Sequence, residues 1–401
     1  MTRKGLAPRC ENICNRLKRI PTKIETFKLS SGWLRDDARS EHHNAVERTR
    51  SFPRGFPLKA ETICGRSPLS RRRFIFGATA TALLLPTRRA AAAKFELRQF
   101  HNQPSTSPLH NRLTELWAAV EAETNGAVVV RTFPENDHLP GGDPAALKLL
   151  VEGGLDFLTL MGGLIAPLVP AAQVQGIPFA FRDHAEVYAA MDGDLGDYLR
   201  QELTAKNIYA VPRGCFENGF RHITCTVKPI HNAEDLLGLK MRTPNSPIFT
   251  DLFESLGTTP VAYNVNQLYD CLKSGAADAE ENALAVVEAF KLYEIQKYVS
   301  LTSHMWSGFN QLANLKLWQQ FPSDTQRTIE RNIAKFAALQ RADNEELNAT
   351  LKVRLTEQGM SVNEAETSSF RARLGPFYGR WKEIVGKRAW EILESHVGKL
   401  A

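Results

Sequence analysis

The stretch Gly238-Leu239-Lys240-Met241-Arg242-Thr243-Pro244 places an arginine at the end of a short predicted strand and just before a proline turn. Backbone on both sides restricts this side chain, and a planar guanidinium binds a carboxylate through two parallel hydrogen bonds. Arg221 lies upstream, at the end of residues 216–221. The pair indicates a site for a small organic acid. For any one arginine, an ordinary solvated or structural ion pair is the alternative.

Strand and helix patterns alternate on both sides of this stretch. Period-two or apolar runs predict strands, and amphipathic spacing with caps predicts helices. In the first half we expect strands at 95–100, 127–133 and 155–161, and helices at 109–124 and 143–150. This alternation predicts a largely parallel sheet with helices on its faces.

The second half continues the alternation. We expect two strands at 208–211 and 220–226, helices at 246–256 and 265–274, and a crossing segment from residue 278. Two separate helices follow at 323–342 and 344–359, and residues 370–397 are aromatic and helical, with Phe377, Trp381 and Trp390 as packing anchors.

Residues 70–93 have the layout of an export signal. Ser70-Arg71-Arg72-Arg73-Phe74-Ile75 is close to the twin-arginine motif, and an apolar run at 74–85 and small residues at 90–93 follow it. The run is too short for a permanent membrane span. We expect a twin-arginine signal peptide at 70–93, export to the periplasm and a mature chain that starts near Lys94. A buried helix of a cytosolic domain is the alternative.

Residues 1–69 are rich in Arg and Lys and have no periodic apolar spacing. We interpret them as a non-native extension, with translation starting near Leu69, or as a disordered basic tail. Residues 1–93 hold 20 of the 50 Lys and Arg and 7 of the 44 Asp and Glu, so residues 94–401 carry 30 basic and 37 acidic residues. Their formal charge is −7, which argues against nucleic-acid binding.

The chain has no P-loop, zinc-protease, nucleophile-elbow or dinucleotide-binding motif, and its ten histidines show no zinc-ligand spacing. We therefore expect no catalytic residue, no metal and no cofactor. Cys215, Cys225 and Cys271 allow at most one disulfide, and burial as small apolar side chains is the simpler interpretation.

A series of segments carries a family resemblance over nearly all of residues 95–400. They are LVEGGLD at 150–156, GIPFAF at 176–181, GDLG at 193–196, KPI at 228–230, EDLLGLKMRTP at 234–244, SLG at 255–257, GAADAE at 275–280 and KYVSLT at 297–302. In these segments and their order the chain resembles the solute-binding proteins of TRAP (tripartite ATP-independent periplasmic) transporters, of the DctP type.

The resemblance implies an α/β fold of two lobes, with lobe-crossing strands and a long helix spanning both lobes. We expect lobe I at 94–218 and 308–345, and lobe II at 219–307 and 346–401. It also implies a periplasmic receptor, monomeric or homodimeric, that binds a small organic carboxylate such as a sugar acid or hydroxy acid. The receptor would pass this ligand to the small and large integral membrane subunits of the transporter.

The resemblance also implies roles for single residues. Arg242 matches the main carboxylate clamp, Arg221 would reach the same ligand from the neighbouring strand, and Asn282 matches a ligand-binding asparagine. The loop after the first strand would supply partners for ligand hydroxyls, namely His101, Asn102 and Gln103.

Four further positions carry open interpretations. Trp306 either stacks on the ligand or packs in the core or hinge, and Asn218 either binds the ligand or shapes the entry to a strand. At least one of Glu280 and Glu281, beside an anion site, should point away from it or bind a ligand hydroxyl.

The chain departs from the family at Ala279, where glycine is usual, and at Ala283, where proline is frequent. Two other function classes also stay open. One is a periplasmic sensory module for a receptor kinase, and the other is an exported α/β enzyme.

Overall fold

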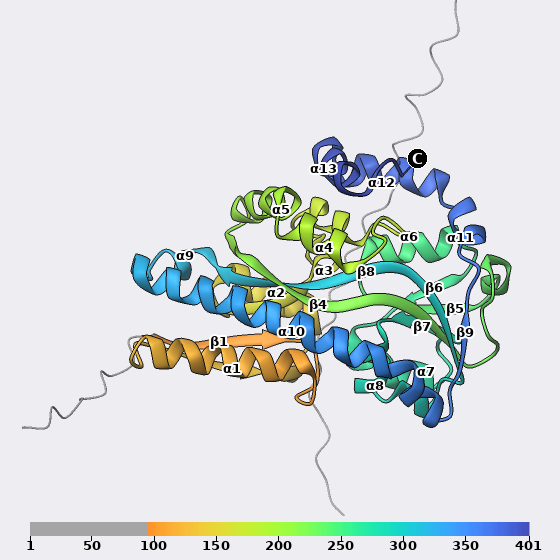
Figure 1. Ribbon diagram of the computed structural model, residues 1–401, viewed down its shortest axis with the longest axis horizontal. Coiled ribbons are helices and arrows are strands. Elements are labelled where there is room, and N and C mark those ends of the chain that lie inside the picture. The colour runs from red at the N-terminus through yellow and green to blue at the C-terminus, as the bar shows by residue number, and fades with distance from the viewer. Residues whose placement is uncertain (1–94, 401) are drawn as a thin grey trace, which may run out of the picture. The chain divides into compact units, whose positions relative to one another are not determined.

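The computed structural model describes residues 95–400, which are coloured in Figure 1. The predicted export signal and the preceding extension lie outside the described residues. The strands form one mixed sheet in the order β2-β1-β3-β8-β4-β7-β5-β6, and β9 pairs with β8. Their bounds are β1 Phe95–His101, β2 Val128–Phe133, β3 Phe157–Met161, β4 Ile208–Cys225, β5 Lys240–Thr243, β6 Thr259–Ala262, β7 Ala279–Asn282, β8 Tyr298–Asn314 and β9 Ser361–Glu364.

The sheet is parallel at its two ends and antiparallel in its middle. β1 pairs in parallel with β2 and β3, and β5 pairs in parallel with β6 and β7. The central pairs β3–β8, β8–β4 and β4–β7 are antiparallel. The prediction of a largely parallel sheet was therefore wrong for the centre of the sheet. Alternation of strands and helices along the chain does not show which strands pair, and the central pairs join strands that are far apart in the sequence.

The two predicted strands at 208–211 and 220–226 are the ends of the single strand β4. Pro212 falls inside it, and the register with β8 shifts between Ala210 and Cys215. Such an irregularity lets a strand carry a proline that cannot donate to the ladder. β4 and β8 run side by side along their lengths, as Figure 1 shows.

The helices cover the sheet. Their bounds are α1 Pro108–Glu123, α2 Gly142–Glu152, α3 Gly162–Ile165, α4 His184–Met191, α5 Asp194–Thr204, α6 Pro247–Ser255, α7 Leu268–Lys273, α8 Leu284–Ala289, α9 Leu315–Trp318, α10 Ser323–Glu357, α11 Ser368–Ala372, α12 Gly375–Val385 and α13 Lys387–Val397. α12 packs on the short helix η2 (Pro170–Gly176), and α13 packs on η2, α4 and α5. No helix within residues 95–400 is long and apolar enough to cross a membrane.

α10 is one helix of 35 residues, where the sequence pattern predicted two. The sequence predicted a break near residue 343. The polar residues there, Asp343 and Asn344, form hydrogen bonds with other elements and do not cap a helix end. Asp343 accepts from Arg112 Nε at 2.6 Å, and Asn344 Nδ2 donates to the main-chain oxygen of Glu217 at 2.9 Å. The long helix implied by the resemblance is confirmed. α10 packs against α1 near one end and α8 near the other (Figure 1).

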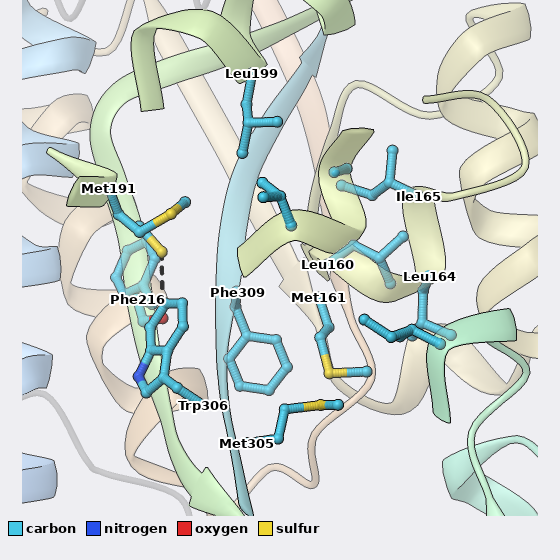
Figure 2. Packing of buried hydrophobic residues seen from close by; sticks show 14 of the residues in the cluster. Leu160, Met161, Leu164, Ile165, Met191, Leu199, Phe216, Met305, Trp306 and Phe309 are labelled. Carbon is cyan, nitrogen blue, oxygen red and sulfur yellow. Dashed lines mark hydrogen bonds between the residues drawn. The ribbon is translucent and has the colours of Figure 1, made fainter. Parts of the chain in front are cut away.

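Buried apolar side chains form two clusters, and the larger includes residues of both expected lobes. The larger contains Phe377, Trp381 and Trp390, which confirms these packing anchors, and the smaller surrounds Leu268 and Leu351. Figure 2 shows part of the larger cluster around β8. The division of residues 94–401 between the lobes stays a prediction.

We expect Gln340→Ala to destabilise the fold through β4. The Gln340 carboxamide accepts from Glu217 N at 2.7 Å and donates to Glu217 O at 2.8 Å, and both residues are buried. Glu217 O keeps the bond from Asn344 Nδ2, but the buried Glu217 N–H loses its side-chain acceptor, at a cost of about 1–3 kcal/mol in the free energy of unfolding. Urea unfolding of residues 94–401 measures it. Glu345→Ala, at an exposed position of the same helix, is the control, and equal stability of the two variants would contradict the expectation.

Candidate functional site

Side chains that lie far apart in the sequence border one small cavity, among them Asn102, Arg221, Arg242 and Asn282. β4, β5 and β7, which carry the last three, are neighbours in the sheet. The cavity holds about 30 Å³, which accommodates roughly two water molecules.

Arg242 on β5 is buried without a carboxylate partner. Its side chain is 1% exposed, and its Nε and Nη2 atoms donate to the main-chain oxygen of Tyr263 at 3.2 and 2.6 Å. Within residues 95–400, no carboxylate oxygen lies within 4.0 Å of the guanidinium, and Nη1 has no hydrogen-bond partner. Burial lowers the pKa of Arg242, and the carboxyls of Glu280 and Glu281 oppose the shift. Arginine stays charged in proteins, so this guanidinium offers positive charge and free N–H donors to the cavity.

Arg221 on β4, by contrast, is largely occupied by Glu281. Its Nε donates to Glu281 Oε2 at 2.5 Å and its Nη2 to Glu281 Oε1 at 2.8 Å. Nη2 also donates to Asn282 Oδ1 at 2.8 Å, and Nη1 contacts Ser307 Oγ at 3.2 Å. The charge of Arg221 is therefore matched inside the protein. Its expected contact with a ligand stays a prediction and involves the Nη1 side of the guanidinium.

The neighbouring acids both bind protein groups. Burial alone would raise the pKa of Glu281, but Arg221 and His304 outweigh it and hold this pKa below its usual value. Glu280 accepts from Thr224 Oγ1 at 3.0 Å, and burial raises the pKa of Glu280 to about 7 against the opposing effect of Arg242. Neither acid borders the cavity.

Two predicted asparagines border the cavity and hold the strands around it. Asn282 accepts from Arg221 and donates from Nδ2 to Glu280 Oε2 at 2.6 Å. Asn218 donates from Nδ2 to Ser307 Oγ at 2.8 Å, which ties β4 to β8.

The three predicted residues of the loop after β1 take different positions. Asn102 and Gln103 border the cavity, whereas His101 does not. The His101 ring instead lies 2.9 Å (Nε2 to Nδ1) from His110 and accepts from Gln103 N at 3.2 Å. Burial, together with the charge of His110, lowers the pKa of His101 to about 3, so the ring is neutral. The structure thus places His101 behind the loop that carries the other two residues.

Trp306 also lies away from the cavity. It donates from Nε1 to Glu217 Oε1 at 2.8 Å and contacts the Phe181 ring edge to face, with 6.3 Å between ring centroids. Figure 2 shows Phe309 between Trp306 and Met161, a cavity residue. Of the two interpretations left open, the structure favours packing.

The sequence analysis missed three polar residues of the cavity, Asp143, Asn245 and Asn264. Asp143 starts the predicted helix at 143–150, and its local sequence carries no signal beyond that of a helix start. Gly142 has a φ of +58°, and a side chain there would meet Asn264 Cγ at 3.0 Å, so glycine permits the close approach of these two segments. Burial raises the pKa of Asp143, and two asparagine amides and Arg242 oppose that shift.

Residues 95–400 contain no group of His, Cys, Asp and Glu side chains that could hold a metal ion. Cys215, Cys225 and Cys271 are free and buried, as the simpler interpretation predicted. What the arrangement offers chemically is a buried cation beside a wall of amides, a setting for binding an anion with polar substituents.

Comparisons with known proteins identify the family of the chain. The DctP family model, described as bacterial extracellular solute-binding protein, family 7, matches residues 100–384. A solute-binding protein of Verminephrobacter eiseniae is 31% identical over 279 residues, which cover 69% of this chain and 82% of that protein.

Solved structures give the same result. The sugar acid binding protein DctPAm of Advenella mimigardefordensis, in complex with galactonate, is 25% identical with a TM-score of 0.73 and covers 78% of this chain and 100% of its own. A TRAP periplasmic solute binding protein of Polaromonas, bound to D-erythronate, is 27% identical with a TM-score of 0.71, covering 75% and 98%. The chain belongs to the DctP family of bacterial extracellular solute-binding proteins.

Proposed function

We propose that this protein is a periplasmic receptor that binds a small organic carboxylate at Arg242 and delivers it to the small and large membrane subunits of a TRAP-type transporter. The observation that carries the proposal is the buried guanidinium without a carboxylate partner within residues 95–400. Burial of an unpaired charge costs free energy, and a ligand carboxylate offsets that cost when it binds. The solved relatives bound to galactonate and D-erythronate support the same ligand class.

The size of the cavity supports a mechanism with an open form. About 30 Å³ is too small for an acid of several carbons. The ligand therefore enters after the cavity residues of β4, β5 and the loop after β1 have moved apart. Bonds from its carboxylate to Arg242, and from its hydroxyls to Asn102 or Gln103, then favour closure by the difference in affinity between the two forms.

We expect Arg242→Lys to abolish binding almost as fully as Arg242→Ala. A lysine ammonium cannot reproduce two parallel N–H donors and leaves the Tyr263 oxygen without its present partners. Loss of a buried charged contact costs about 2–5 kcal/mol of binding free energy. Thermal shift with galactonate, glucuronate, D-erythronate and succinate, followed by calorimetry, measures the effect.

Circular dichroism establishes that the Arg242 variants are folded. Arg327→Lys, at an exposed position of α10, is the matched control and should bind like the wild type. Tight binding by Arg242→Lys would rule out a bidentate clamp, and wild-type protein that responds to no acid would rule out the carboxylate receptor.

Carboxylate affinity should fall as the pH rises from about 6 to 8. Glu280 has a pKa of about 7, so it is mostly neutral below this pH and negative above it, near Arg242. An anionic ligand therefore binds more tightly to the protonated form. Calorimetric titrations in this range should show a several-fold change for the wild type and a flat profile for Glu280→Gln. The same slope in both proteins would assign the pH dependence to another group.

We also propose export by the twin-arginine route, on the motif at residues 70–75. The double change Arg71→Lys and Arg72→Lys should keep the precursor in the cytoplasm, whereas Arg73→Lys should be exported. Cell fractionation with immunoblotting distinguishes them, and periplasmic accumulation of the double variant would contradict this route.

A further inference from the structure

Part of the cavity wall is made of amides around one acid. This inference rests on the proposed carboxylate binding at Arg242. A second, smaller cavity of about 10 Å³ adjoins the first, and Asn102, Asp143 and Asn264 border both. Asn136, in the turn before α2, borders the smaller cavity and is 3% exposed. Arg242 borders only the larger of the two, so the smaller forms a polar extension of the site.

Asp143 orders the hydrogen bonds of this wall. Both of its oxygens accept amide protons, Oδ1 from Asn136 Nδ2 at 2.8 Å and Oδ2 from Asn102 Nδ2 at 3.1 Å. Asn102 Oδ1 accepts in turn from Gln103 Nε2 at 3.0 Å. Because a carboxylate only accepts, the two asparagines must turn their NH₂ groups to it and their oxygens away.

These hydrogen bonds leave two side-chain oxygens, those of Asn136 and Gln103, without a donor among the described residues. Asn136 Oδ1 is buried and has no hydrogen-bond partner within residues 95–400. Gln103 donates one of its two amide protons to Asn102, and its side-chain oxygen accepts no hydrogen bond within residues 95–400, so this oxygen is an acceptor open to the cavity. A buried acceptor without a partner costs free energy, and a ligand hydroxyl can donate to it, whereas a ligand carboxylate cannot.

The charges favour a single ligand carboxylate. Arg221 is matched by Glu281, so among the described residues that border the two cavities Arg242 is the cation without a carboxylate contact. The acids Glu135 and Asp143 border the extension, and no Lys, Arg or His of residues 95–400 does so in the smaller cavity. A second ligand carboxylate would therefore meet no cation and two acids.

We propose that the site takes a polyhydroxylated monocarboxylate and rejects the corresponding dicarboxylate, and that Asp143 is the residue that determines this specificity. The ligand carboxylate binds Arg242, and the hydroxyls at the other end donate to the oxygens that Asp143 orients toward the cavity. Asp143 acts by repelling a second carboxylate and by fixing the orientation of Asn102 and Asn136.

Matched acids that differ at one carbon test the proposal. Galactonate and galactarate, gluconate and glucarate, and 4-hydroxybutyrate and succinate each exchange a terminal CH₂OH for a carboxylate. Calorimetry on the mature protein should give at least about tenfold tighter binding of the monocarboxylate in whichever pair binds, since a desolvated like-charge contact costs several kcal/mol. Asp143→Asn should narrow this ratio, because an asparagine carries no charge and can donate to a carboxylate.

Asp137→Asn is the matched control. Asp137 lies in the same turn as Asn136 and is exposed, so its variant loses the same charge and should keep the wild-type ratio. Asn136→Ala supplies a second test if Asp143→Asn does not fold, and it should weaken the monocarboxylate more than the dicarboxylate.

Dicarboxylates that bind wild type as tightly as their partners, with binding lost in Arg242→Ala, would overturn this inference and leave the receptor function intact. If Asp143→Asn and Asn136→Ala each weaken the binding of a monocarboxylate and its matched dicarboxylate by the same factor, the specificity role of Asp143 is overturned. Absence of any binding that depends on Arg242 would overturn the proposed function itself.

Discussion

The Arg242 guanidinium is buried without a carboxylate partner within residues 95–400, and the rest of the site depends on this unpaired charge. A buried, uncompensated cation costs several kcal/mol, and only partial compensation is present, from the Tyr263 main-chain oxygen and from the field of Glu280 and Glu281. The fold supplies that free energy through its two apolar clusters, both of which include side chains of β8. A receptor gains from this arrangement because the free energy is recovered when the ligand supplies the missing anion.

The second arginine shows how the surroundings set the role of a charge. Arg221 carries the same guanidinium on the adjacent strand, yet Glu281 binds two of its nitrogens and His304 holds Glu281 from the other side at 3.3 Å. Such a buried pair contributes little net charge to the cavity and instead fixes the geometry of β4 against β7. Two arginines that look equivalent in the sequence are thus a free cation and a structural ion pair.

Side chains alternate between the two faces of the sheet along β4 and β8, so neighbouring residues contact different parts of the protein. Asn218, a cavity residue, bonds to Ser307, whereas the adjacent Glu217 side chain accepts from Trp306 and from Tyr188 of α4. Successive side chains of a strand point to opposite faces, so a shift of one residue separates a ligand group from a packing group. Trp306 was therefore hard to assign without the register, and so was His101, whose ring turns toward His110 while Asn102 and Gln103 face the cavity.

The sequence by itself determined the family, the α/β class and the position of Arg242, because an ordered set of short motifs and local strand and helix periodicity are properties of contiguous residues. It also predicted most element positions, from β1 to the aromatic C-terminal helices. Tertiary structure alone decided the antiparallel centre of the sheet, the continuity of α10 through Asp343 and Asn344, and the pairing of Arg221 with Glu281. It also decided the place of Asp143 in the site. Each of these depends on contacts between segments distant in the chain, which propensity and spacing do not encode.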